Sequence, residues 1–550
     1  MFSVREERSV TMEFRRIAAA LGALALLASS PVWAMTLEEK AGQVLALSFS
    51  GTSLDEETRF RLEEIKPGGL ILYGKNVESL SQVRSLLSSI RERVRLDIPL
   101  MVAVDQEGGT VARIRGHGAD FPGNMALGAT GDPDLAERQG FIMGRQLKSL
   151  GIDLDYAPVV DVNSNPSNPI IGVRSFGDDV ATVSSMGASM IKGFSRARMG
   201  CSAKHFPGHG DVDIDSHLGL PVLNRSLESM RYLEFPPFRS AVEAGVPAVM
   251  TAHIVVPSLT GELPATLSPE AISLLRDEMG FEGVVLSDSM GMRAISNGWG
   301  VPDAVVMALR AGVDFVLLGA DPAFPPEGHR EVRDRIVEAV RSGELDKARL
   351  DDAVERILRW KDDMGLFSGE VRPDWVGGSA LAEEIASRSV TLIRSDGPPP
   401  PLRKGDHVTL IWPEKRVAAA ELLLSRLSDL GVSGRIVLFG GRTAPDVNVN
   451  DIKGPVLMGC YDLVRDEPSA SFLREVLEEK PDCVSLSMKT PYDLTVLPEA
   501  ETALACFGDT PPTLEALASI LLGEIRPSGH LPVELPGLYP RGWGVSWSSR

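Results

Sequence analysis

Residues 99–105 read PLMVAVD, a short apolar run that ends in a carboxylate. Between residues 43 and 319 the chain holds seven similar runs, and stretches with helical spacing such as DLAERQGFIMGRQLKSL (134–150) separate them. The seven runs are QVLALSF (43–49), GGLILY (68–73), DLDYAPVVD (153–161), CSAKHF (201–206), PAVMTAH (247–253), GVVLSD (283–288) and DFVLLG (314–319). Short, nearly continuous apolar strands that alternate with helices are typical of a parallel sheet. Eight such units predict a closed (β/α)8 barrel over residues 35–365, with an open sheet carrying insertions as the alternative.

Polar side chains follow several of these runs at the point where the strand ends. They are Asp105, Asp161, Lys204 with His205, His253 and Asp288. The carboxyl ends of barrel strands meet at one face, where the active sites of barrel enzymes lie. One polar strand end would indicate a turn, but several directed at one face predict a functional site.

A second domain follows the predicted barrel. The segment RWKDDMGLFSGEVRPDWVGGS (359–379) breaks the alternation with Gly, Pro and charges, and we interpret residues 366–380 as a linker. Six more apolar runs then alternate with helical stretches, which predicts a smaller α/β sandwich over residues 381–550. Two domains also agree with the length of 550 residues, which is too long for one compact core.

Composition restricts the partners and the compartment. The chain has 75 acidic and 56 basic residues, a net charge of −19, which argues against a nucleic-acid partner. Its four cysteines are too few for a disulfide scaffold, so we expect buried free thiols. One bridge among Cys460, Cys483 and Cys506 stays open, and so does the oligomeric state.

The N-terminus has the form of an export signal. Two arginines precede the apolar run IAAALGALALLASS (17–30), and the small-residue site PVWA (31–34) follows it. This arrangement predicts a secretory signal peptide over residues 1–34. The run is shorter than the ~20 residues of a membrane-spanning helix. We therefore expect a periplasmic or extracellular protein without a stable membrane span after cleavage.

The stretch KHFPGHGDVDIDSH (204–217) holds three of the chain's eight histidines. An EF-hand calcium loop is excluded, because Ser216 and Val222 stand where its Gly and bidentate Glu are needed. Pro and Gly between the first two histidines exclude a helical zinc motif, while a loop-borne metal site using His217 stays open. The run SDSMG (287–291) is a weak match to a serine-hydrolase elbow, since it lacks the first Gly.

The remaining interpretation pairs Asp215 with His217. In extended backbone, residues two apart project to the same side, so the carboxylate would fix the tautomer of the imidazole and raise its basicity. An oriented imidazole suits general acid/base catalysis. An isolated Asp-Ser-His triplet would be an ordinary solvated loop, but this one follows a predicted barrel strand and Asp288 ends another.

Four motifs in this order resemble glycoside hydrolase family 3, and within it the bacterial β-N-acetylglucosaminidases (β-hexosaminidases). They are VDQEGGTVARI (104–114), APVVDVNSNPSNPIIGVRSFG (157–177), KHFPGHGDVDIDSH (204–217) and GVVLSDSMGM (283–292). The resemblance covers residues 36 to about 365 and continues more loosely through residues 485–498 and 521–536.

The resemblance implies a retaining mechanism. Asp288 stands in the place of the nucleophile that forms a covalent glycosyl–enzyme intermediate. His217 stands in the place of the acid/base residue, with Asp215 orienting it. The resemblance also implies a set of residues that bind the sugar: Asp105, Arg113, Arg174 near the 2-acetamido group, Lys204 and His205. No cofactor and no metal are implied, and no catalytic role for the second domain.

One departure from the family's glucosidases bears on substrate. Those enzymes have Trp after the nucleophile, whereas Ser289 follows Asp288 here. The resemblance therefore implies an exo-acting β-N-acetylglucosaminidase for peptidoglycan fragments or chitooligosaccharides. A β-glucosidase or β-xylosidase of the same family is the nearest alternative. A metal-dependent hydrolase on a barrel and a non-catalytic carbohydrate-binding protein are more distant ones. Phosphate in place of water as the acceptor also stays open.

Overall fold

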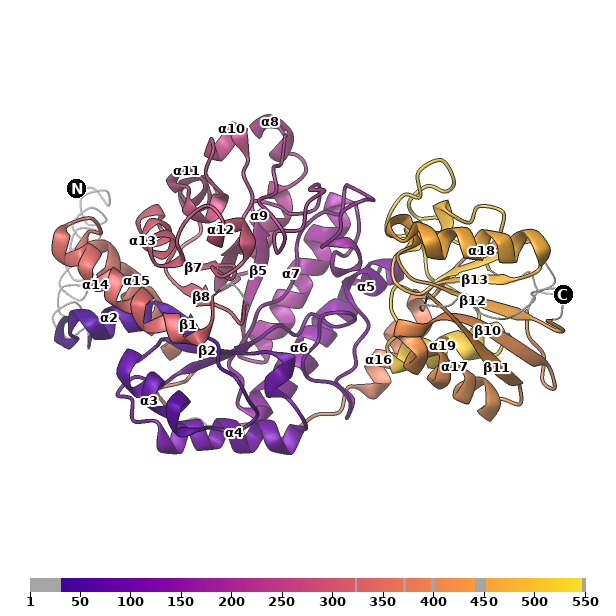
Figure 1. Cartoon of the computed structure of the whole chain (residues 1–550), viewed down its shortest axis with the longest axis horizontal. Coiled ribbons are helices and arrows are strands. Elements are labelled where there is room, and N and C mark those ends of the chain that lie inside the picture. Colours follow the sequence, from indigo (N-terminus) through magenta and orange to yellow (C-terminus); the bar gives the residue numbers. More distant parts are fainter. Residues whose placement is uncertain (1–30, 322–323, 369–371, 397–400, 441–451, 547–550) are drawn as a thin grey trace, which may run out of the picture.

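The computed structural model of the chain describes residues 31–321, 324–368, 372–396, 401–440 and 452–546. Most of the predicted signal peptide, residues 1–30, lies outside the described residues. Two bodies lie side by side in Figure 1, a larger N-terminal one coloured from indigo to pink and a smaller C-terminal one from orange to yellow. No described helix is long and apolar enough to cross a membrane.

The N-terminal body is the predicted barrel. Its strands are β1 (Leu45–Leu47), β2 (Gly69–Leu72), β3 (Met101–Val104), β4 (Leu154–Asp155), β5 (Gly200–Phe206), β6 (Ala248–Thr251), β7 (Val284–Ser287) and β8 (Val316–Leu318). They form one sheet in the order β7-β6-β5-β4-β3-β2-β1-β8, and neighbouring strands in this order run parallel. The Ser287 N–H donates to the Phe315 carbonyl at 3.0 Å, which joins β7 to the start of β8 and closes the sheet. The closed barrel is confirmed over the open sheet.

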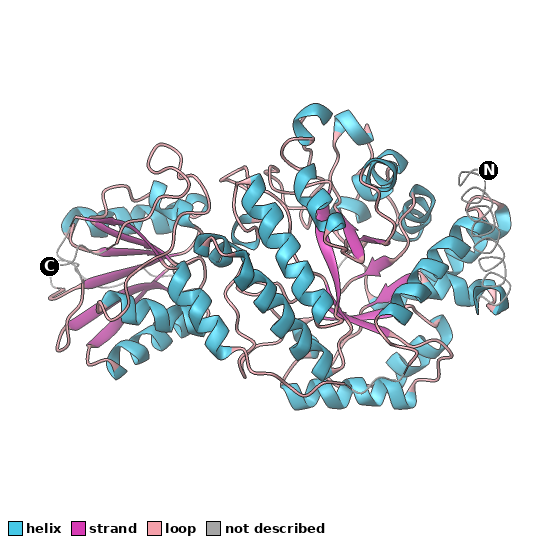
Figure 2. Cartoon of the chain, turned by 180° about the vertical axis from the view of Figure 1, so that it is seen from behind, coloured by secondary structure: helices cyan, strands magenta, loops and turns pink. Residues whose placement is uncertain are grey.

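The strands are short and apolar because both of their faces are covered. Every residue of β1 to β8 is buried, one face toward the barrel interior and the other toward the helices. The barrel domain contains the helices α2 (Leu37–Gln43), α3 (Glu56–Ile65), α4 (Leu80–Arg93), α5 (Asn124–Thr130), α6 (Pro133–Leu150), α7 (Val180–Arg196), α8 (Leu227–Met230), α9 (Phe235–Glu243), α10 (Pro257–Thr260), α11 (Pro269–Ser273), α12 (Arg293–Ser296), α13 (Val301–Ala311), α14 (His329–Ser342) and α15 (Lys347–Asp363). Figure 2 shows the long helices outside the strands.

The C-terminal body is an α/β sandwich. Its strands are β9 (Thr391–Ser395), β10 (His407–Pro413), β11 (Ser433–Phe439), β12 (Val456–Cys460), β13 (Val484–Ser487) and β14 (Thr502–Ala505), in the order β11-β10-β12-β13-β14-β9. All pairs are parallel except β14 with β9. The helices α17 (Val417–Asp429) and α19 (Pro511–Leu521) pack on one face, and α18 (Glu467–Glu479) packs on the other. All four cysteines are buried free thiols, as expected.

An apolar cluster joins the two bodies next to the mouth of the barrel. It contains Met125 and Val173 of the barrel domain together with Ile393, Tyr492 and Val533 of the sandwich. Helix α16 (Ser379–Ser389), which precedes β9, packs on α5 and α6 as well as on α19. The sandwich is therefore held where its loops can reach the barrel's carboxyl-terminal face.

Candidate active site

A cavity of about 440 Å³ opens at the carboxyl ends of the barrel strands. This volume is in the range of ligand-binding sites. The cavity is lined by the residues that follow β3, β5 and β7, and by loops of the C-terminal body. All the predicted site residues except Asp215 line it: Asp105, Arg113, Arg174, Lys204, His205, His217 and Asp288. Asp215 contacts the cavity through His217.

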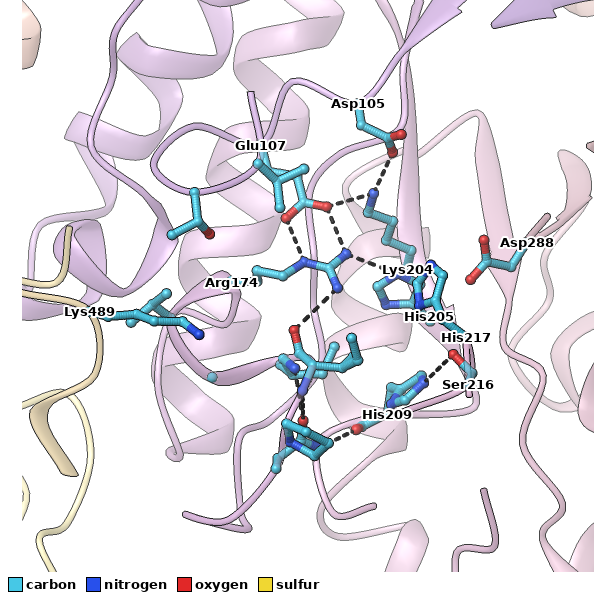
Figure 3. Close-up of a pocket in the computed structure, with 18 of the residues that line it drawn as sticks. Asp105, Glu107, Arg174, Lys204, His205, His209, Ser216, His217, Asp288 and Lys489 are labelled. Atoms are coloured by element: carbon cyan, nitrogen blue, oxygen red, sulfur yellow. Dashed lines mark hydrogen bonds and ion pairs between the residues drawn. The ribbon is translucent and has the colours of Figure 1, made fainter. Parts of the chain in front are cut away.

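The inner end of the cavity is a lattice of ion pairs around Lys204 (Figure 3). The Lys204 ammonium lies 3.0 Å from Asp105 Oδ1 and 2.7 Å from Glu107 Oε1. The Arg174 guanidinium donates to both oxygens of Glu107, at 2.8 and 2.9 Å. The side chains of Lys204 and Glu107 are each 2% exposed, so these charges are removed from water and are stabilised by one another.

The side chains of this lattice of ion pairs are held in their charged forms. Burial alone would raise the pKa of Glu107, but Arg174 and Lys204 hold that pKa well below its usual range. Burial opposes the charge of Lys204, yet Glu107 and Asp105 raise its pKa. Charged donors and acceptors fixed in advance are suited to binding several sugar hydroxyls.

The sequence analysis missed Glu107, although it lies within the quoted DQEGG motif. Among the predicted residues, Arg174 binds Glu107 directly, and Arg113 lies 3.8 Å from Asp105 Oδ2 at the edge of the lattice. The Arg113 N–H donates to the side chain of Gln106 at 2.8 Å, which fixes the loop after β3. The signal that could have found Glu107 is a second carboxylate two residues after a strand-end carboxylate.

His205 is oriented by Asp161, which follows β4. Its Nδ1 lies 2.8 Å from Asp161 Oδ2, and its Nε2 lies 3.3 Å from Arg174 Nη2. The His209 backbone N–H also donates to Asp161, at 2.7 Å. Burial alone would raise the pKa of Asp161. His205 and His209 outweigh this effect, so the net pKa is lowered and the carboxyl stays ionised. Asp161 was predicted only as a polar strand end, and it positions His205 from beneath the cavity.

The loop after β5 passes close to the loop after β4, and glycine allows this. A Cβ on Gly210 would lie 1.7 Å from the Val162 carbonyl oxygen, which no side chain could occupy. The HFPGHG segment is therefore pressed against its neighbour before the chain turns outward to His217.

Asp288 directly follows β7 and is half-buried on the side of the cavity formed by β6 to β8. The Ser289 N–H donates to Asp288 Oδ1 at 2.7 Å. Burial alone would raise the pKa of Asp288. His253, His205 and the Ser289 N–H have the opposite effect and outweigh it, so the net pKa of this carboxyl is lowered. Among the described residues, no hydrogen bond is made to the other oxygen of Asp288, and an ionised carboxylate that faces a cavity in this way can act as a nucleophile.

His253 has the structural role that its burial suggests. Its Nε2 lies 2.9 Å from the Ser289 carbonyl and its Nδ1 lies 2.9 Å from Thr266 Oγ1. The Ser289 hydroxyl donates to Asp321, a carboxylate after β8 that the sequence analysis missed. Burial raises the pKa of Asp321. These contacts fix the backbone that presents Asp288.

His217 and Asp215 form the predicted pair at the outer part of the cavity. His217 Nδ1 lies 2.9 Å from Asp215 Oδ1, and the His217 N–H donates to the same oxygen at 2.8 Å. The expectation of an extended backbone is wrong. The Leu218 N–H donates to the Asp215 carbonyl at 2.8 Å, so residues 215–218 form a turn. The turn brings the two side chains together because the carboxylate binds the backbone and the ring at once.

The C-terminal body lines the outer part of the cavity, opposite Asp288 (Figure 3). Lys489 Nζ and Arg465 both pair with Asp462, at 2.9 and 2.6 Å. The Asn163 side-chain amide donates to the Tyr492 hydroxyl at 3.0 Å, which ties the two bodies at the cavity wall. The sequence analysis did not assign these residues, although Lys489 and Tyr492 lie within residues 485–498, over which the family resemblance continues. Apolar periodicity does not predict which loops of one domain reach another.

The chain matches the family model described as the glycosyl hydrolase family 3 N-terminal domain over residues 36–360. It is 30% identical to beta-hexosaminidase A of Pseudoalteromonas piscicida, over 88% of this chain and 91% of that protein. It is 36% identical to a beta-hexosaminidase of Stenotrophomonas maltophilia (strain K279a), over 56% of this chain and 90% of that protein.

Among solved structures, a glycoside hydrolase family 3 beta-N-acetylglucosaminidase from Paenibacillus sp. str. FPU-7 aligns with a TM-score of 0.84 and 34% identity. The alignment covers 91% of this chain and 99% of that one, so both bodies are shared. With the barrel, the cavity at its carboxyl-terminal face and these matches, the chain belongs to glycosyl hydrolase family 3 and is a glycoside hydrolase.

Proposed function

We propose that this protein is a retaining exo-β-N-acetylglucosaminidase that releases terminal N-acetylglucosamine from peptidoglycan fragments or chitooligosaccharides. The observation that carries this proposal is the Asp215–His217 pair in the same cavity as the ionised Asp288. One group supplies a nucleophile and the other an acid/base, which are the two functions that a retaining glycosidase needs.

In the first step, Asp288 attacks the anomeric carbon while the bond from that carbon to the leaving oxygen breaks. The protonated His217 donates its Nε2 proton to the leaving oxygen, while the other proton stays on Nδ1 and remains hydrogen-bonded to Asp215. The product is a glycosyl ester of Asp288. The Asp215 carboxylate lies 2.9 Å from Nδ1 and so holds the ring in place during the transfer.

In the second step, water attacks the same carbon from the face that the leaving group vacated. His217, now neutral, takes the proton of the water, and the ester bond to Asp288 breaks. Two displacements at one carbon restore the β configuration. Because a neutral imidazole replaces the carboxylate base of most glycosidases, phosphate meets less repulsion as an acceptor than it would beside two carboxylates.

The lattice at the inner end supports exo action. Asp105, Lys204 and His205 offer donors and acceptors to the hydroxyls of one sugar ring, and the buried Lys204–Glu107 pair closes the cavity behind it. A second sugar therefore has room only toward His217 and the C-terminal body. The specificity for N-acetylglucosamine is supported by the names of the relatives and by Ser289 after the nucleophile, which leaves that side of the cavity without a Trp ring.

We also propose export to the periplasm or the medium. The support is the basic pair, apolar run and small-residue site over residues 1–34. The N-terminal sequence of the protein recovered from its own host tests this, since it would begin at residue 35. Recovery of the uncleaved chain from the cytoplasm would contradict it.

The test of the activity uses p-nitrophenyl β-N-acetylglucosaminide and the matching β-glucoside. We expect activity on the first substrate, no effect of EDTA, and loss of that activity in Asp288→Ala. His217→Ala should lose about 10²–10⁴-fold of kcat/KM on substrates whose leaving group needs a proton. NMR of the first-formed product should show the β anomer, as free sugar in water and as the 1-phosphate if phosphate is the acceptor.

Three results would contradict the proposal: preference for the glucoside, full activity of His217→Ala on a substrate whose leaving group needs a proton, or an inverted product. Glu137→Gln serves as the control, because Glu137 forms an exposed ion pair with Arg196 on the helical surface. It should retain wild-type rates.

A further inference from the structure

The turn that carries His217 is ordered within itself and is attached to the barrel at Ser216, whose carbonyl accepts the Ala294 N–H at 3.2 Å and whose hydroxyl lies 3.5 Å from His209 Nε2. The Asp215 carbonyl accepts the N–H groups of Leu218 and Gly219, at 2.8 and 3.1 Å, and its carboxylate binds His217. His217 is 58% exposed, and Ile214 and Leu218 on either side are 44% and 68% exposed. The position of the imidazole relative to the sugar therefore depends on the contacts of Ser216 and on where the start of this loop is held.

Arg225 holds the start of the loop. Its guanidinium lies 2.8 Å from Asp211 Oδ2 through both Nε and Nη2, and Nη2 donates to Ser164 Oγ at 3.3 Å. Nε also lies 3.0 Å from Glu234 Oε1. The backbone of Arg225 is fixed in turn, since the Ser258 hydroxyl donates to its carbonyl at 2.6 Å. One side chain thus joins the loops after β4 and β5 to the residue that precedes α9.

Glu234 shows that this junction is built into the fold. It is 5% exposed at the start of α9, and among the described residues neither of its carboxylate oxygens accepts a hydrogen bond. Burial raises its pKa to about 7, although Arg225 opposes the shift. A Cβ on Gly208 would lie 2.7 Å from Glu234 Cγ, so the HFPGH turn packs directly on this side chain. A buried carboxyl without other partners needs the cation beside it.

We propose that Arg225 is a positioning residue for acid/base catalysis, which fixes the His217 turn by binding Asp211 to Glu234 and Ser164. This inference rests on the proposed function, because it assigns Arg225 an effect through His217. The planar guanidinium donates to Asp211 and Ser164 and pairs with Glu234 at the same time, and a lysine in its place would reach fewer of these partners. Small displacements of a catalytic group lower the rate strongly, so release of Asp211 should weaken proton donation without removing the imidazole.

The test compares two leaving groups. The sugar alcohol that leaves N,N′-diacetylchitobiose needs a proton, whereas 2,4-dinitrophenolate leaves the corresponding β-N-acetylglucosaminide without one. The ratio kcat/KM reports the steps up to departure of the leaving group. For Arg225→Gln we expect a fall of about 10–100-fold on the disaccharide and less than about threefold on the dinitrophenyl glycoside. Arg225→Lys should fall in between. Equal falls on both substrates, or none on either, would overturn the positioning role.

Further variants separate this inference from the proposed function. His217→Ala should show the same selectivity more strongly, and Arg225→Gln added to it should cause no further selective loss. If His217→Ala loses both substrates equally, the acid assignment is wrong and the positioning role falls with it. If His217→Ala is selective but Arg225→Gln and Asp211→Asn are not, only the positioning role is wrong. Asp211→Asn carries the comparison if Arg225→Gln does not fold. Arg231→Gln, which breaks an exposed pair with Glu278, is the matched control.

Discussion

The two ends of the active-site cavity are built in opposite ways. At the inner end, Lys204 and Glu107 are 2% exposed and each charge lies within hydrogen-bonding distance of an opposite one. At the outer end, His217 is 58% exposed on a turn that Arg225 holds from a distance. Under the proposed function, the inner groups bind the same sugar ring in each cycle and gain from being preorganised. The outer groups must admit different leaving groups and then water, which requires access.

The largest effect should come from the residue between these two regions. Asp288→Ala removes the proposed nucleophile, and we expect kcat/KM to fall by at least about 10⁴-fold with little change in the free energy of unfolding. Azide added to this variant should fill the space of the carboxylate and restore turnover, and it should yield the α-glycosyl azide by a single displacement. Rates measured with and without azide, and NMR of the product, check this. A β-azide would mean that another nucleophile acts.

A break in the inner lattice should affect both activity and stability. Glu107→Gln leaves Lys204 and Arg174 without their buried counter-charge, which we expect to lower the free energy of unfolding by about 3–5 kcal/mol. Denaturant unfolding measures this, and kcat/KM should fall in the same variant.

The matching change at the outer end is His217→Ala. Because His217 is exposed, this variant should stay within about 0.5 kcal/mol of wild type in unfolding while its activity falls. Similar stability in both variants would contradict the distinction between a fixed inner end and an accessible outer end.

A buried histidine away from the cavity extends the comparison to a buried polar group that has no hydrogen-bond partner among the described residues. His329, at the start of α14, is fully buried, and neither ring nitrogen has a partner among the described residues. Burial lowers its pKa to about 3. Between pH 6.5 and pH 3 the unfolded chain binds the proton and the folded chain does not, so stability falls as the pH falls.

His329→Leu removes this pH-dependent loss of folding stability. At pH 5 we expect the variant to be more stable than wild type by about 2 kcal/mol through this linkage, and the advantage should shrink above pH 7. Thermal unfolding at pH 5 and pH 8 measures it, with the exposed His530→Leu as the control. An equal gain at both pH values would show that packing, and not proton binding, is responsible.

The smallest effect should come from the C-terminal wall. Lys489 is 32% exposed and pairs with Asp462, so Lys489→Ala should raise KM for a chitotriose substrate by about threefold. The p-nitrophenyl glycoside, whose aglycone is a single ring, should be unaffected. A loss on both substrates would mean that Lys489 supports the inner end instead.

The sequence predicted the parts of the molecule that regular periodicity controls. Eight apolar runs located the barrel, and the polar residues that end five of them placed Asp105, Lys204 and Asp288 at one face, because parallel strands end together. The family motifs added Arg113, Arg174 and His217.

The parts that the sequence missed depend on how loops fold back. Glu107 and Asp321 follow strand ends by a few residues, and only the path of the loop turns them toward the cavity. The Asp215–His217 pair was predicted, but a turn produces it and an extended strand does not. The contribution of Lys489 depends on how the two bodies dock. An antiparallel β9 also could not be read from an apolar run, which has the same appearance in either direction.

The most direct test of the account is to trap the glycosyl–enzyme intermediate. A 5-fluoro N-acetylglucosaminyl fluoride should react and then turn over slowly, because fluorine destabilises the positive charge that develops in both steps. Trypsin would release residues 277–293, a peptide that contains Asp288, and tandem mass spectrometry locates the added sugar. The account predicts the adduct on Asp288. An adduct on any other residue, or turnover with inversion and no adduct, would contradict it.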